Sequence, residues 1–322
     1  MQTRRLGRSG FVLSSTGFGG GPVGWATAPD ADAVAGVTLT AAWELGIRYF
    51  DTAPYYGFGK SEKRIGRFLR MRPRNEFVLS SKVGRLIRPA FEGDLSPSQV
   101  RFDYSRDGTM RSIEDSLLRL GLDRIDIALI HDIDGWTHAG EQPQRFAEAV
   151  DGAYRALSDL KSQGVIRAIG LGVNEWRVCL DFAKQVPVDC FLLAGQVTLL
   201  EHAAERAFLP YCEAEGIGVI AGGPFNSGIL ASGAVEGAQF HYGPAGDDVL
   251  ARVRRLEEIC SSHNVALAAA ALAFPLRFPA VASVIPGIAS VPEAERLAGN
   301  IAAAIPEALW NDLEREWGMH SP

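Results

Sequence analysis

The sequence predicts an α/β fold in which one parallel sheet closes into a (β/α)8 barrel, the TIM-barrel architecture. Short apolar runs alternate with longer amphipathic runs along the chain, which is typical of βαβ units. Eight such strands follow an N-terminal hairpin, and eight units in 322 residues fit one barrel. Three consecutive strands run directly into a titratable residue, on the face where barrels carry their sites. We therefore expect a single domain over residues 1–322.

The first elements are a hairpin and the barrel strands. Two strand-like pieces flank Gly7-Arg8-Ser9-Gly10, which predicts a β-hairpin over residues 2–14. In chain order the predicted strands are Thr16–Gly19, Ile47–Phe50, Phe77–Ser81, Ile125–Ile130, Arg167–Leu171, Cys190–Ala194, Ile217–Ala221 and Val281–Ile285. Amphipathic spacing predicts the helices Ala31–Leu45, Ser61–Arg70, Thr109–Leu120, Arg145–Ser162, Trp176–Ala183, Ala203–Glu215, Asp248–Ser262, Leu267–Arg277, Pro292–Ala303 and Pro306–Glu316.

An open, doubly wound sheet is the alternative architecture. It would carry a Gly-x-Gly-x-x-Gly turn directly after its first strand. Gly17, Gly19, Gly20 and Gly21 lie near that place but do not have the spacing. The barrel therefore fits the sequence better.

Charge and composition narrow the classes of partner. The net charge is −6, and the basic cluster Arg252–Arg255 is followed by Glu257 and Glu258, which favours a solvated helix face over a nucleic-acid site. No apolar stretch of about 18 residues is present to span a membrane, and we find no signal peptide. We expect a cytoplasmic protein that acts on a small molecule, without nucleic-acid or membrane partners.

The cysteine pattern argues against a metal or a disulfide. Cys179, Cys190, Cys212 and Cys260 form no Cys-x-x-Cys pair and no Cys/His spacing of a zinc site. Each lies in an apolar or amphipathic stretch, so we expect buried free thiols and no metal.

Four polar residues gather at one end of the predicted barrel. Asp51, Lys82 and His131 each directly follow an apolar strand, and Tyr56 comes five residues after Asp51. The carboxyl ends of parallel barrel strands lie on one face, so a carboxylate, an ammonium, an imidazole and a phenol share one rim. Taken singly, Asp51 and Lys82 fit a structural ion pair, His131 a loop contact and Tyr56 a packing residue. Their coincidence on one rim favours a catalytic site.

The chemistry of this set is proton transfer at an oxygen. A tyrosine phenol has a pKa near 10. An ammonium about 4 Å away favours the phenolate by up to about 4 kcal/mol, or roughly 3 pKa units. We expect Tyr56 to act as acid/base, Lys82 to lower its pKa, Asp51 to hold Lys82, and His131 to orient a substrate oxygen. The hydride itself must come from a cofactor, since side chains do not supply one.

The residues around this set resemble the aldo-keto reductase family. The resemblance rests on the run Asp51–Gly57 (DTAPYYG), on Ser61-Glu62 and Gly66, and on Lys82 and His131 after their strands. It covers almost the whole chain, from the N-terminal hairpin to Asn300. It implies a barrel whose bottom is closed by the hairpin, and hydride transfer with an extended nicotinamide cofactor that needs no Rossmann domain.

The resemblance also implies where this cofactor binds. Asn174 and Gln196 would bind the nicotinamide carboxamide, although each also fits a loop cap. The glycine-rich loop 222–228 would approach the pyrophosphate, and a plain flexible loop is the alternative. Four-residue spacing places Arg296 and Asn300 on one helix face, as in an adenosine clamp, unless Arg296 is only a surface residue. The expected cofactor residues are Gly19, Asp51, Asn174, Gln196, Gly222, Pro224, Phe225, Ser227, Gly228, Pro286, Gly287, Ile288, Arg296 and Asn300.

Departures from the family pattern bear on the cofactor. Gly222 replaces the aromatic residue that usually stacks on nicotinamide, which leaves Phe225 as a candidate. The run Gly170–Asn174 is one residue longer than in the family and lacks its serine. Gly287 stands where many members place a lysine for the 2′-phosphate of NADP. We therefore expect NAD to be preferred over NADP, with Arg296 as a remaining cation.

The substrate is less determined by the sequence. The run Gly170–Trp176 and the run Gly222–Leu230 look most like the branch of aldose 1-dehydrogenases and pyridoxal 4-dehydrogenases. That branch implies oxidation of a cyclic hemiacetal, for example L-fucose or D-arabinose, to a lactone; pyridoxal or a general aldehyde or ketone is the alternative. The segment Arg85–Gly108 and the loop His131–Gln144, with Trp136 and His138, would shape the pocket. We expect Trp25, Tyr56, His131 and Trp136 to line it.

Two other function classes remain as alternatives. Some barrels of this family are redox-sensing subunits of a membrane channel, but no docking element is evident here. A metal-dependent hydrolase would need a His-x-His pair or a carboxylate-rich rim, and the sequence has neither. The sequence does not predict the oligomeric state.

Overall fold

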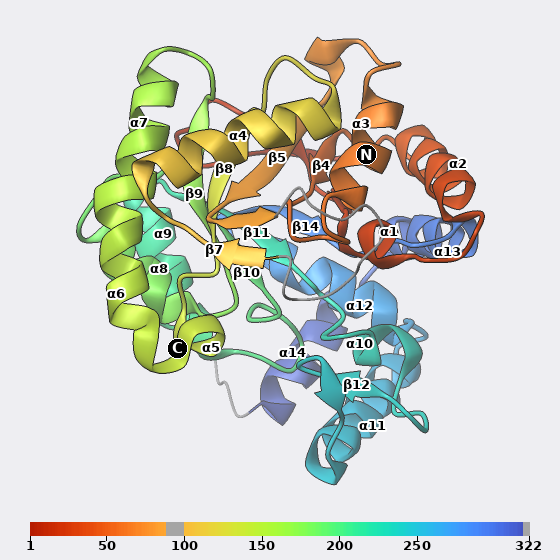
Figure 1. Ribbon diagram of the computed structural model, residues 1–322. Helices are drawn as coiled ribbons and strands as arrows, with labels where there is room; N and C mark the ends of the chain where they lie inside the picture. The colour runs from red at the N-terminus through yellow and green to blue at the C-terminus, as the bar shows by residue number, and fades with distance from the viewer. Residues whose placement is uncertain (88–99, 318–322) are drawn as a thin grey trace.

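The protein is a closed barrel of eight parallel strands in the computed structural model, which describes residues 1–87 and 100–317 (Figure 1). In spatial order the strands are β3 (Phe18–Gly19), β4 (Tyr49–Asp51), β5 (Val78–Val83), β8 (Ile127–His131), β9 (Ala168–Val173), β10 (Cys190–Ala194), β11 (Gly218–Gly222) and β14 (Val281–Ile285). Parallel bridges from Thr16 to Val284 and from Gly19 to Gly287 join the last strand to the first. The predicted fold class is confirmed.

Helices surround this barrel, and at least one helix follows each strand, as predicted. They are α2 (Ala31–Glu44), α3 (Lys60–Leu69), α4 (Arg106–Leu120), α6 (Gln142–Glu148) running through a π-helical turn into α7 (Arg155–Ser162), α8 (Trp176–Ala183), α9 (Phe208–Glu215), α12 (Leu267–Ala273) and α13 (Val291–Ala302). Local chemistry sets their ends. Ser105 accepts a hydrogen bond from Gly108 N and begins α4, and Gly121 ends it with φ 63°. The predicted helix Leu267–Arg277 is α-helical only to Ala273, because Pro275 has no N–H to continue it.

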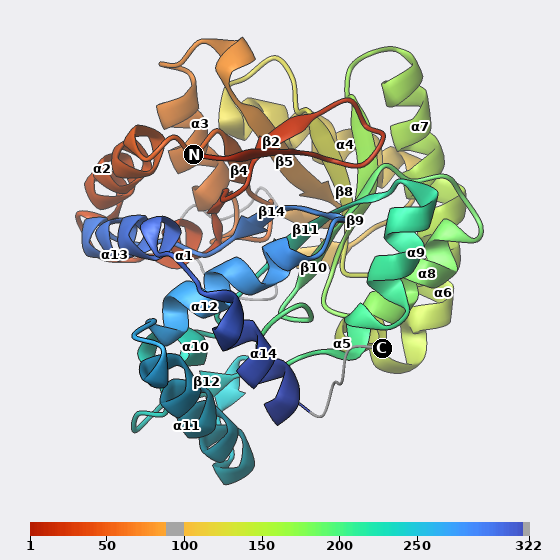
Figure 2. The same ribbon diagram turned by 180° about the vertical axis from the view of Figure 1, so that it is seen from behind.

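Several elements were not predicted from the sequence. They are the short helices α1 (Gly21–Trp25), α5 (Gly135–His138) and α10 (Ile229–Ser232), the hairpin β6 (Arg85–Ile87)–β7 (Val100–Phe102), and the hairpin β12 (Gln239–Phe240)–β13 (Gly243–Pro244). All follow the carboxyl ends of barrel strands. Part of the segment Arg85–Gly108, residues 88–99, lies outside the described residues. The remaining helices, α11 (Asp247–Ser262) and α14 (Glu307–Glu316), pack on each other beside the barrel (Figure 2).

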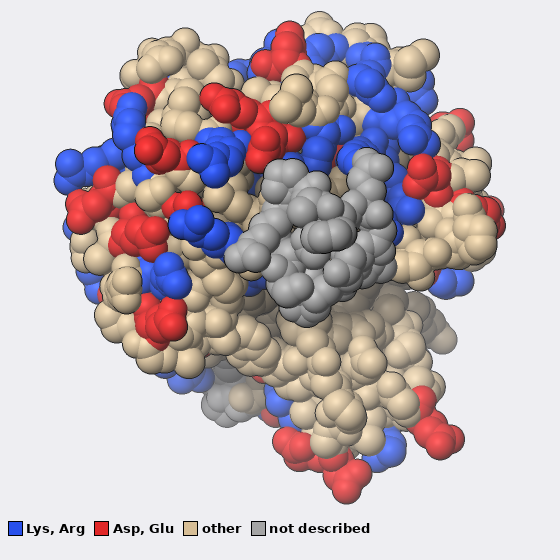
Figure 3. All heavy atoms as spheres, viewed as in Figure 1, with Lys and Arg blue, Asp and Glu red and all other residues tan. Residues whose placement is uncertain are grey.

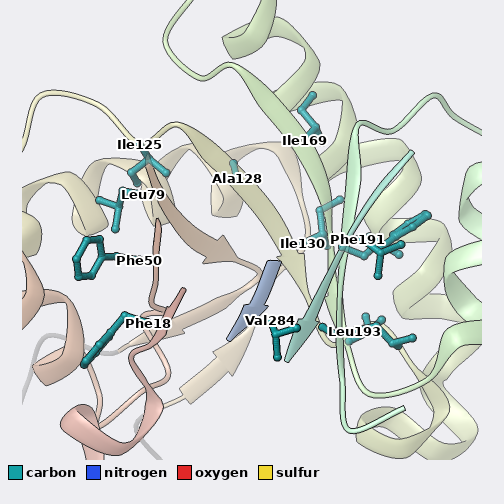
Figure 4. Packing of buried hydrophobic residues seen from close by; sticks show 14 of the residues in the cluster. Phe18, Phe50, Leu79, Ile125, Ala128, Ile130, Ile169, Phe191, Leu193 and Val284 are labelled. Carbon is teal, nitrogen blue, oxygen red and sulfur yellow. The ribbon is translucent and has the colours of Figure 1, made fainter. Parts of the chain in front are cut away.

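Side chains alternate between the barrel interior and the surrounding helices. In β8, Ala128 and Ile130 face the helices, whereas Ile127 and Leu129 belong to a separate interior cluster. Figure 4 shows the helix-facing set, with Ile130 directed outward from the sheet. This period of two is the pattern of a strand buried on both faces.

The N-terminal hairpin closes the amino end of the barrel. Its strands β1 (Thr3–Arg5) and β2 (Val12–Ser14) pair antiparallel and lie across the barrel in Figure 2. Leu6 and Leu13 are buried in the interior cluster, and Arg8 N donates to Gly216 O, just before β11, at 2.9 Å. The opposite, carboxyl end of the barrel is therefore the open one.

The charged side chains are mixed in sign on the face that Figure 3 shows, and the four cysteines are buried. All four are free, as expected. Within residues 1–87 and 100–317 no single helix is long and apolar enough to cross a membrane, although α11 with Leu267–Arg277 passes that test as a pair bent by 96°.

Candidate active site

The three titratable residues at the strand ends share the interior face of the barrel. Asp51 lies two residues after Tyr49, and His131 two residues after Leu129, so both continue the interior-facing series. Lys82 pairs in register with Leu129 and lies on the same face. The alternation of β-strands therefore brings a carboxylate, an ammonium and an imidazole together.

Lys82 is buried against Asp51. Lys82 Nζ donates to Asp51 Oδ2 at 2.6 Å and to Thr52 O at 3.0 Å. Ser80 Oγ donates to the other oxygen of Asp51 at 2.7 Å. A Cβ on Gly172 would lie 3.0 Å from Lys82 Cε, so this glycine on β9 leaves room inside the barrel for the lysine chain. The predicted ion pair is thus present and held on several sides.

Tyr56 lies on the loop between β4 and α3. Its ring centroid is 4.6 Å from Lys82 Nζ and 6.0 Å from the ring of His131, which stands nearly perpendicular to it. The loop is pressed against α1: Gly57 has φ 60°, and a Cβ there would collide with the carbonyl of Gly24. The glycine of the DTAPYYG run therefore fixes the backbone that carries Tyr56.

Burial dominates the pKa values of this set. Burial raises the pKa of Tyr56 to about 12, because the Lys82 ammonium offsets only part of the cost of a buried phenolate. Burial also raises the pKa of Asp51. It acts to lower the pKa of Lys82, but Asp51 and Tyr56 outweigh it and the net shift is upward. Burial, Arg85 and Lys82 hold the pKa of His131 well below its usual value.

The 2.6 Å contact between Asp51 and Lys82, together with the pKa directions of the other three residues, indicates the charge states at neutral pH. Asp51 and Lys82 form an ion pair, Tyr56 is a protonated phenol and His131 is a neutral imidazole. The sequence predicted that Lys82 would lower the pKa of Tyr56. The lysine acts in that direction, but burial, which a sequence does not reveal, outweighs it.

A cavity of about 450 Å³ opens beside Tyr56 and His131 at the carboxyl end of the barrel. The four residues predicted to line the substrate pocket all border it: Trp25, Tyr56, His131 and Trp136. Tyr55, Lys82, Arg85, Asp132, Thr137, Asn174 and Tyr242 complete its polar and aromatic lining. His138 was expected to shape the pocket; instead its Nε2 lies 3.0 Å from the hydroxyl of Tyr104, behind this lining.

A second cavity, of about 430 Å³, continues from the first. The two share Trp25, Tyr56 and Tyr242. The predicted cofactor residues that border it are Gly19, Asp51, Gly222, Pro224, Phe225, Ser227, Gly228 and Gly287. A third cavity, of about 320 Å³, shares Phe225, Gly228 and Gly287 with the second and is bordered by Pro286, Ile288, Arg296 and Asn300. Together they form one extended cleft from His131 to α13.

The two residues that are expected to bind the nicotinamide carboxamide lie near the place where the first and second cavities meet. Asn174 and Gln196 border a small cavity of about 40 Å³ together with Asn226 and Ser227. Asn174 Nδ2 donates to Asp132 Oδ1 at 3.1 Å, which fixes its side chain. The structure thus brings the whole predicted set to the cleft; which of these residues touches a cofactor stays a prediction.

The second cavity fits an elongated polar ligand. Added Cβ atoms on Gly21 and Gly228 would meet nothing within 4 Å, so bare backbone borders open space there. Asn226 Oδ1 is buried and has no partner among the described residues, while its Nδ2 donates to Gly195 O at 3.1 Å. A buried unpaired acceptor is costly unless a ligand donor satisfies it. These features suit the hydroxyl and amide groups of a dinucleotide.

Comparison with known proteins decides the family. The model of the aldo/keto reductase family matches residues 16–315 of the chain. The chain belongs to this family. Aldo/keto reductases use the nicotinamide cofactors NAD(H) or NADP(H).

Individual relatives agree with this assignment. The chain is 39% identical to a pyridoxal 4-dehydrogenase from Microbacterium luteolum, covering 98% of this chain and 97% of the relative. It is 37% identical to a D-threo-aldose 1-dehydrogenase from a Pseudomonas species, covering 95% and 94%. Its fold is similar to the holo form of an aldo-keto reductase from Bacillus halodurans, with a TM-score of 0.77, 24% identity, and coverage of 98% and 96%.

Several lining residues of this aldo/keto reductase were not singled out from the sequence. Arg85 and Asp132 lie three residues and one residue beyond Lys82 and His131, so their closeness to strand ends was an available signal. Asn226 lies in the loop after β11 and Tyr242 in the turn of the β12–β13 hairpin, both with positive φ, and no periodic pattern marks them. Within residues 1–87 and 100–317, no group of three or more His, Cys, Asp or Glu side chains is arranged to hold a metal ion.

Proposed function

We propose that this aldo/keto reductase oxidises the anomeric hydroxyl of a cyclic hemiacetal, such as L-fucose or D-arabinose, to a lactone. The observation that carries this proposal is the buried set Asp51, Tyr56, Lys82 and His131 at the point where the two main cavities meet. A substrate carbon in the first cavity would there face a nicotinamide in the second. The names of the two relatives support a hemiacetal, since an aldose ring and pyridoxal both present one.

The chain's own residues would manage the proton at the substrate oxygen. When bound, the nicotinamide supplies the hydride acceptor and, in its oxidised form, a positive charge. During oxidation the phenolate form of Tyr56 would accept the hydroxyl proton, and during reduction the protonated phenol would donate it back. Lys82 would stabilise the phenolate, since its charge lowers the pKa of Tyr56. The neutral His131 would hydrogen-bond the same oxygen and orient it.

Asp51 would act through Lys82. Its carboxylate lies 2.6 Å from Lys82 Nζ and keeps the lysine protonated in a buried place. Without that partner, burial would lower the pKa of the lysine and remove the charge that Tyr56 needs.

The dinucleotide would lie along the second and third cavities. The bare backbone at Gly21 and Gly228 allows close approach of a pyrophosphate, and Asn226 Oδ1 would accept from the ligand. Arg296 and Asn300 would contact the adenosine. Tyr242, which borders both main cavities, joins Phe225 as an aromatic candidate near the nicotinamide.

NAD is the proposed cofactor rather than NADP. Gly287 offers no cation to the 2′-phosphate, and its Cβ position is already taken by Pro22. Glu293 borders the same third cavity as Arg296, so its carboxylate would repel a phosphate there. A ribose hydroxyl needs no such cation.

The test is a turnover screen with the purified protein. NAD and NADP are each offered with L-fucose, D-arabinose and pyridoxal, and the absorbance of reduced nicotinamide is followed. The proposal predicts NAD reduction with at least one aldose. Turnover of pyridoxal alone would favour the pyridoxal 4-dehydrogenase alternative, and reduction of simple aldehydes without any hemiacetal oxidation would refute the proposal.

A further inference from the structure

A second buried ion pair lies in the substrate-side cavity and has no part in the proton transfer described above. Arg85 begins β6, and Asp132 directly follows His131 at the end of β8. Arg85 Nη2 lies 2.5 Å from Asp132 Oδ2, and the side chains are only 10% and 9% exposed. Both border the cavity. A buried ion pair gives little net stability, because desolvation offsets the attraction, so its place in this cavity calls for another role.

The pair is held rigidly. Asp132 Oδ1 accepts from Asn174 Nδ2 at 3.1 Å, and Asp132 Oδ2 also lies 3.3 Å from His131 Nε2. The guanidinium of Arg85 lies over the ring of Tyr55, 4.3 Å from its centroid. Both charged groups therefore stay in one geometry without a ligand.

The charges in the cavity are balanced pair by pair. Lys82 is neutralised by Asp51 and Arg85 by Asp132, while His131 is neutral. Among the described residues that border the cavity, no cation is left without a carboxylate. An anionic group on a substrate would lose its hydration here and gain no counter-charge, which is costly.

The same pair offers good partners to hydroxyl groups. Arg85 Nε is buried and has no hydrogen-bond partner among the described residues. A guanidinium has five N–H donors and a carboxylate about four acceptor positions, so both have capacity beyond their mutual contact. A neighbouring donor and acceptor match two adjacent hydroxyls, and the rings of Trp25 and Tyr55 offer apolar faces to the C–H side of a sugar ring.

We propose that Arg85 and Asp132 determine the substrate specificity of this enzyme. They bind the hydroxyls of an uncharged polyhydroxy ring and exclude its phosphorylated or carboxylated analogues. The proposal rests on the proposed hemiacetal oxidation and narrows its substrate class. Asp132 then acts as a charge filter, which means that its carboxylate excludes negatively charged substrates from the cavity. Removing that carboxylate alone leaves the Arg85 cation uncompensated and turns the cavity into an anion site.

The experiment measures anion binding without turnover. Sulfate is titrated into the wild type and Asp132→Asn at constant ionic strength set with chloride, and binding is followed by tryptophan fluorescence, since Trp25 and Trp136 border the cavity. We expect sulfate to bind Asp132→Asn at least about tenfold more tightly than the wild type, because it gains a charge-assisted contact to Arg85.

The matched control is Asp126→Asn. Asp126 is also buried and paired with an arginine, Arg74 at 2.7 Å, but it lies just before β8 at the closed end of the barrel. Sulfate should change the tryptophan fluorescence of this variant no more than that of the wild type. A complementary variant, Arg85→Gln, should raise KM for a neutral aldose more than it lowers kcat. It should not create a sulfate site. This variant also tests the proposal if Asp132→Asn does not fold.

The outcomes separate the two proposals. Equal sulfate affinity in wild type and Asp132→Asn overturns the charge filter, as does wild-type turnover of a uronic acid or aldose phosphate at the rate of the neutral aldose. For Arg85→Gln, an unchanged KM overturns it. The absence of any hemiacetal oxidation contradicts the proposed function instead, because sulfate binding is read without turnover.

Discussion

The substrate half of the cleft is lined by paired charges and aromatic rings, whereas the dinucleotide half is rich in glycine. In the first, Lys82, Arg85 and Asp132 come from strand ends or the residues just beyond them, and Asp51, the partner of Lys82, borders the second cavity. In the second, glycines on the loops after β3 and β11 border the space. The difference teaches that side-chain changes in the first half alter chemistry and selectivity. Changes in the second half mostly alter which cofactor binds and how tightly.

The largest effect should come from the residue at the junction of the halves. Tyr56→Phe removes the proton carrier and should lower kcat by about 10²–10⁴-fold while leaving cofactor affinity nearly unchanged. Steady-state kinetics together with a cofactor titration measure both. The control is Tyr55→Phe, which alters a neighbouring ring of the same cavity and should keep most of the activity. Near-normal turnover of Tyr56→Phe would remove Tyr56 from the mechanism.

The next effect tests the electrostatics of the substrate half. Lys82→Met should move the ascending limb of the pH–rate profile for oxidation to higher pH by about 1 to 3 units, because the lysine lowers the pKa of Tyr56. The sign follows from the charge: without the ammonium, the phenolate forms only at higher pH. A limb at the same pH in wild type and variant would show that Lys82 does not tune Tyr56.

A change in the dinucleotide half should affect affinity alone. Gly287→Lys places a cation at the third cavity and should tighten NADP binding relative to NAD by roughly 10- to 150-fold, the range of a charged hydrogen bond. The new Cβ displaces the ring of Pro22, which should affect the two cofactors alike, so the ratio of their affinities is the quantity to compare. Glu293→Gln should act in the same direction with a smaller effect, since it only removes repulsion. Fluorescence titration of both cofactors decides this. Tighter NADP than NAD binding in the wild type would assign the 2′-phosphate to Arg296.

The smallest effect concerns pH and the charge filter. Burial raises the pKa of Asp132 to about 6, against the pull of Arg85. Below that pH the carboxyl is neutral and Arg85 is uncompensated, so sulfate should bind the wild type a few-fold more tightly as pH falls through 6. The other groups facing Asp132 are Lys82, Asp134, neutral His131 and Asn174. Sulfate affinity in Asp132→Asn should stay flat over this range; the same rise there would assign the titration to another group.

The two halves also differ in how far the sequence predicted them. The sequence predicted Asp51, Lys82 and His131 as site residues because each directly follows an apolar strand. A barrel places the carboxyl ends of its strands together. The main helices and the barrel strands followed from the same periodicity and were found within a few residues of the predicted positions. An exception is the helix predicted to begin at Ala203: a 3-10 turn covers Ala203–Glu205, and α9 begins only at Phe208. The closure of the barrel through Thr16 and Val284 depends on contacts between distant segments. It was nevertheless predicted, because the sequence contains eight strand–helix units, the number found in a closed barrel.

What the sequence did not reveal depends on three-dimensional packing. The pKa of Tyr56 is set by burial, which no local pattern reports. Asn226 and Tyr242 border the cleft from loops held in positive-φ conformations, and neither hydrophobic periodicity nor charge marks them. The Arg85–Asp132 contact joins the starts of two loops that are distant in sequence, so the pair became apparent only in the folded barrel.

Isotope transfer from substrate to cofactor tests the central claim most directly. The wild type is incubated with NAD and an aldose carrying deuterium at C1, and the reduced cofactor is analysed by mass spectrometry, with Tyr56→Phe in parallel. The account predicts deuterium on the nicotinamide, a lactone as the other product, and far slower transfer in Tyr56→Phe. A reduced cofactor without deuterium, or no reduced cofactor with any neutral hemiacetal, would contradict hydride transfer from such a substrate in this cleft.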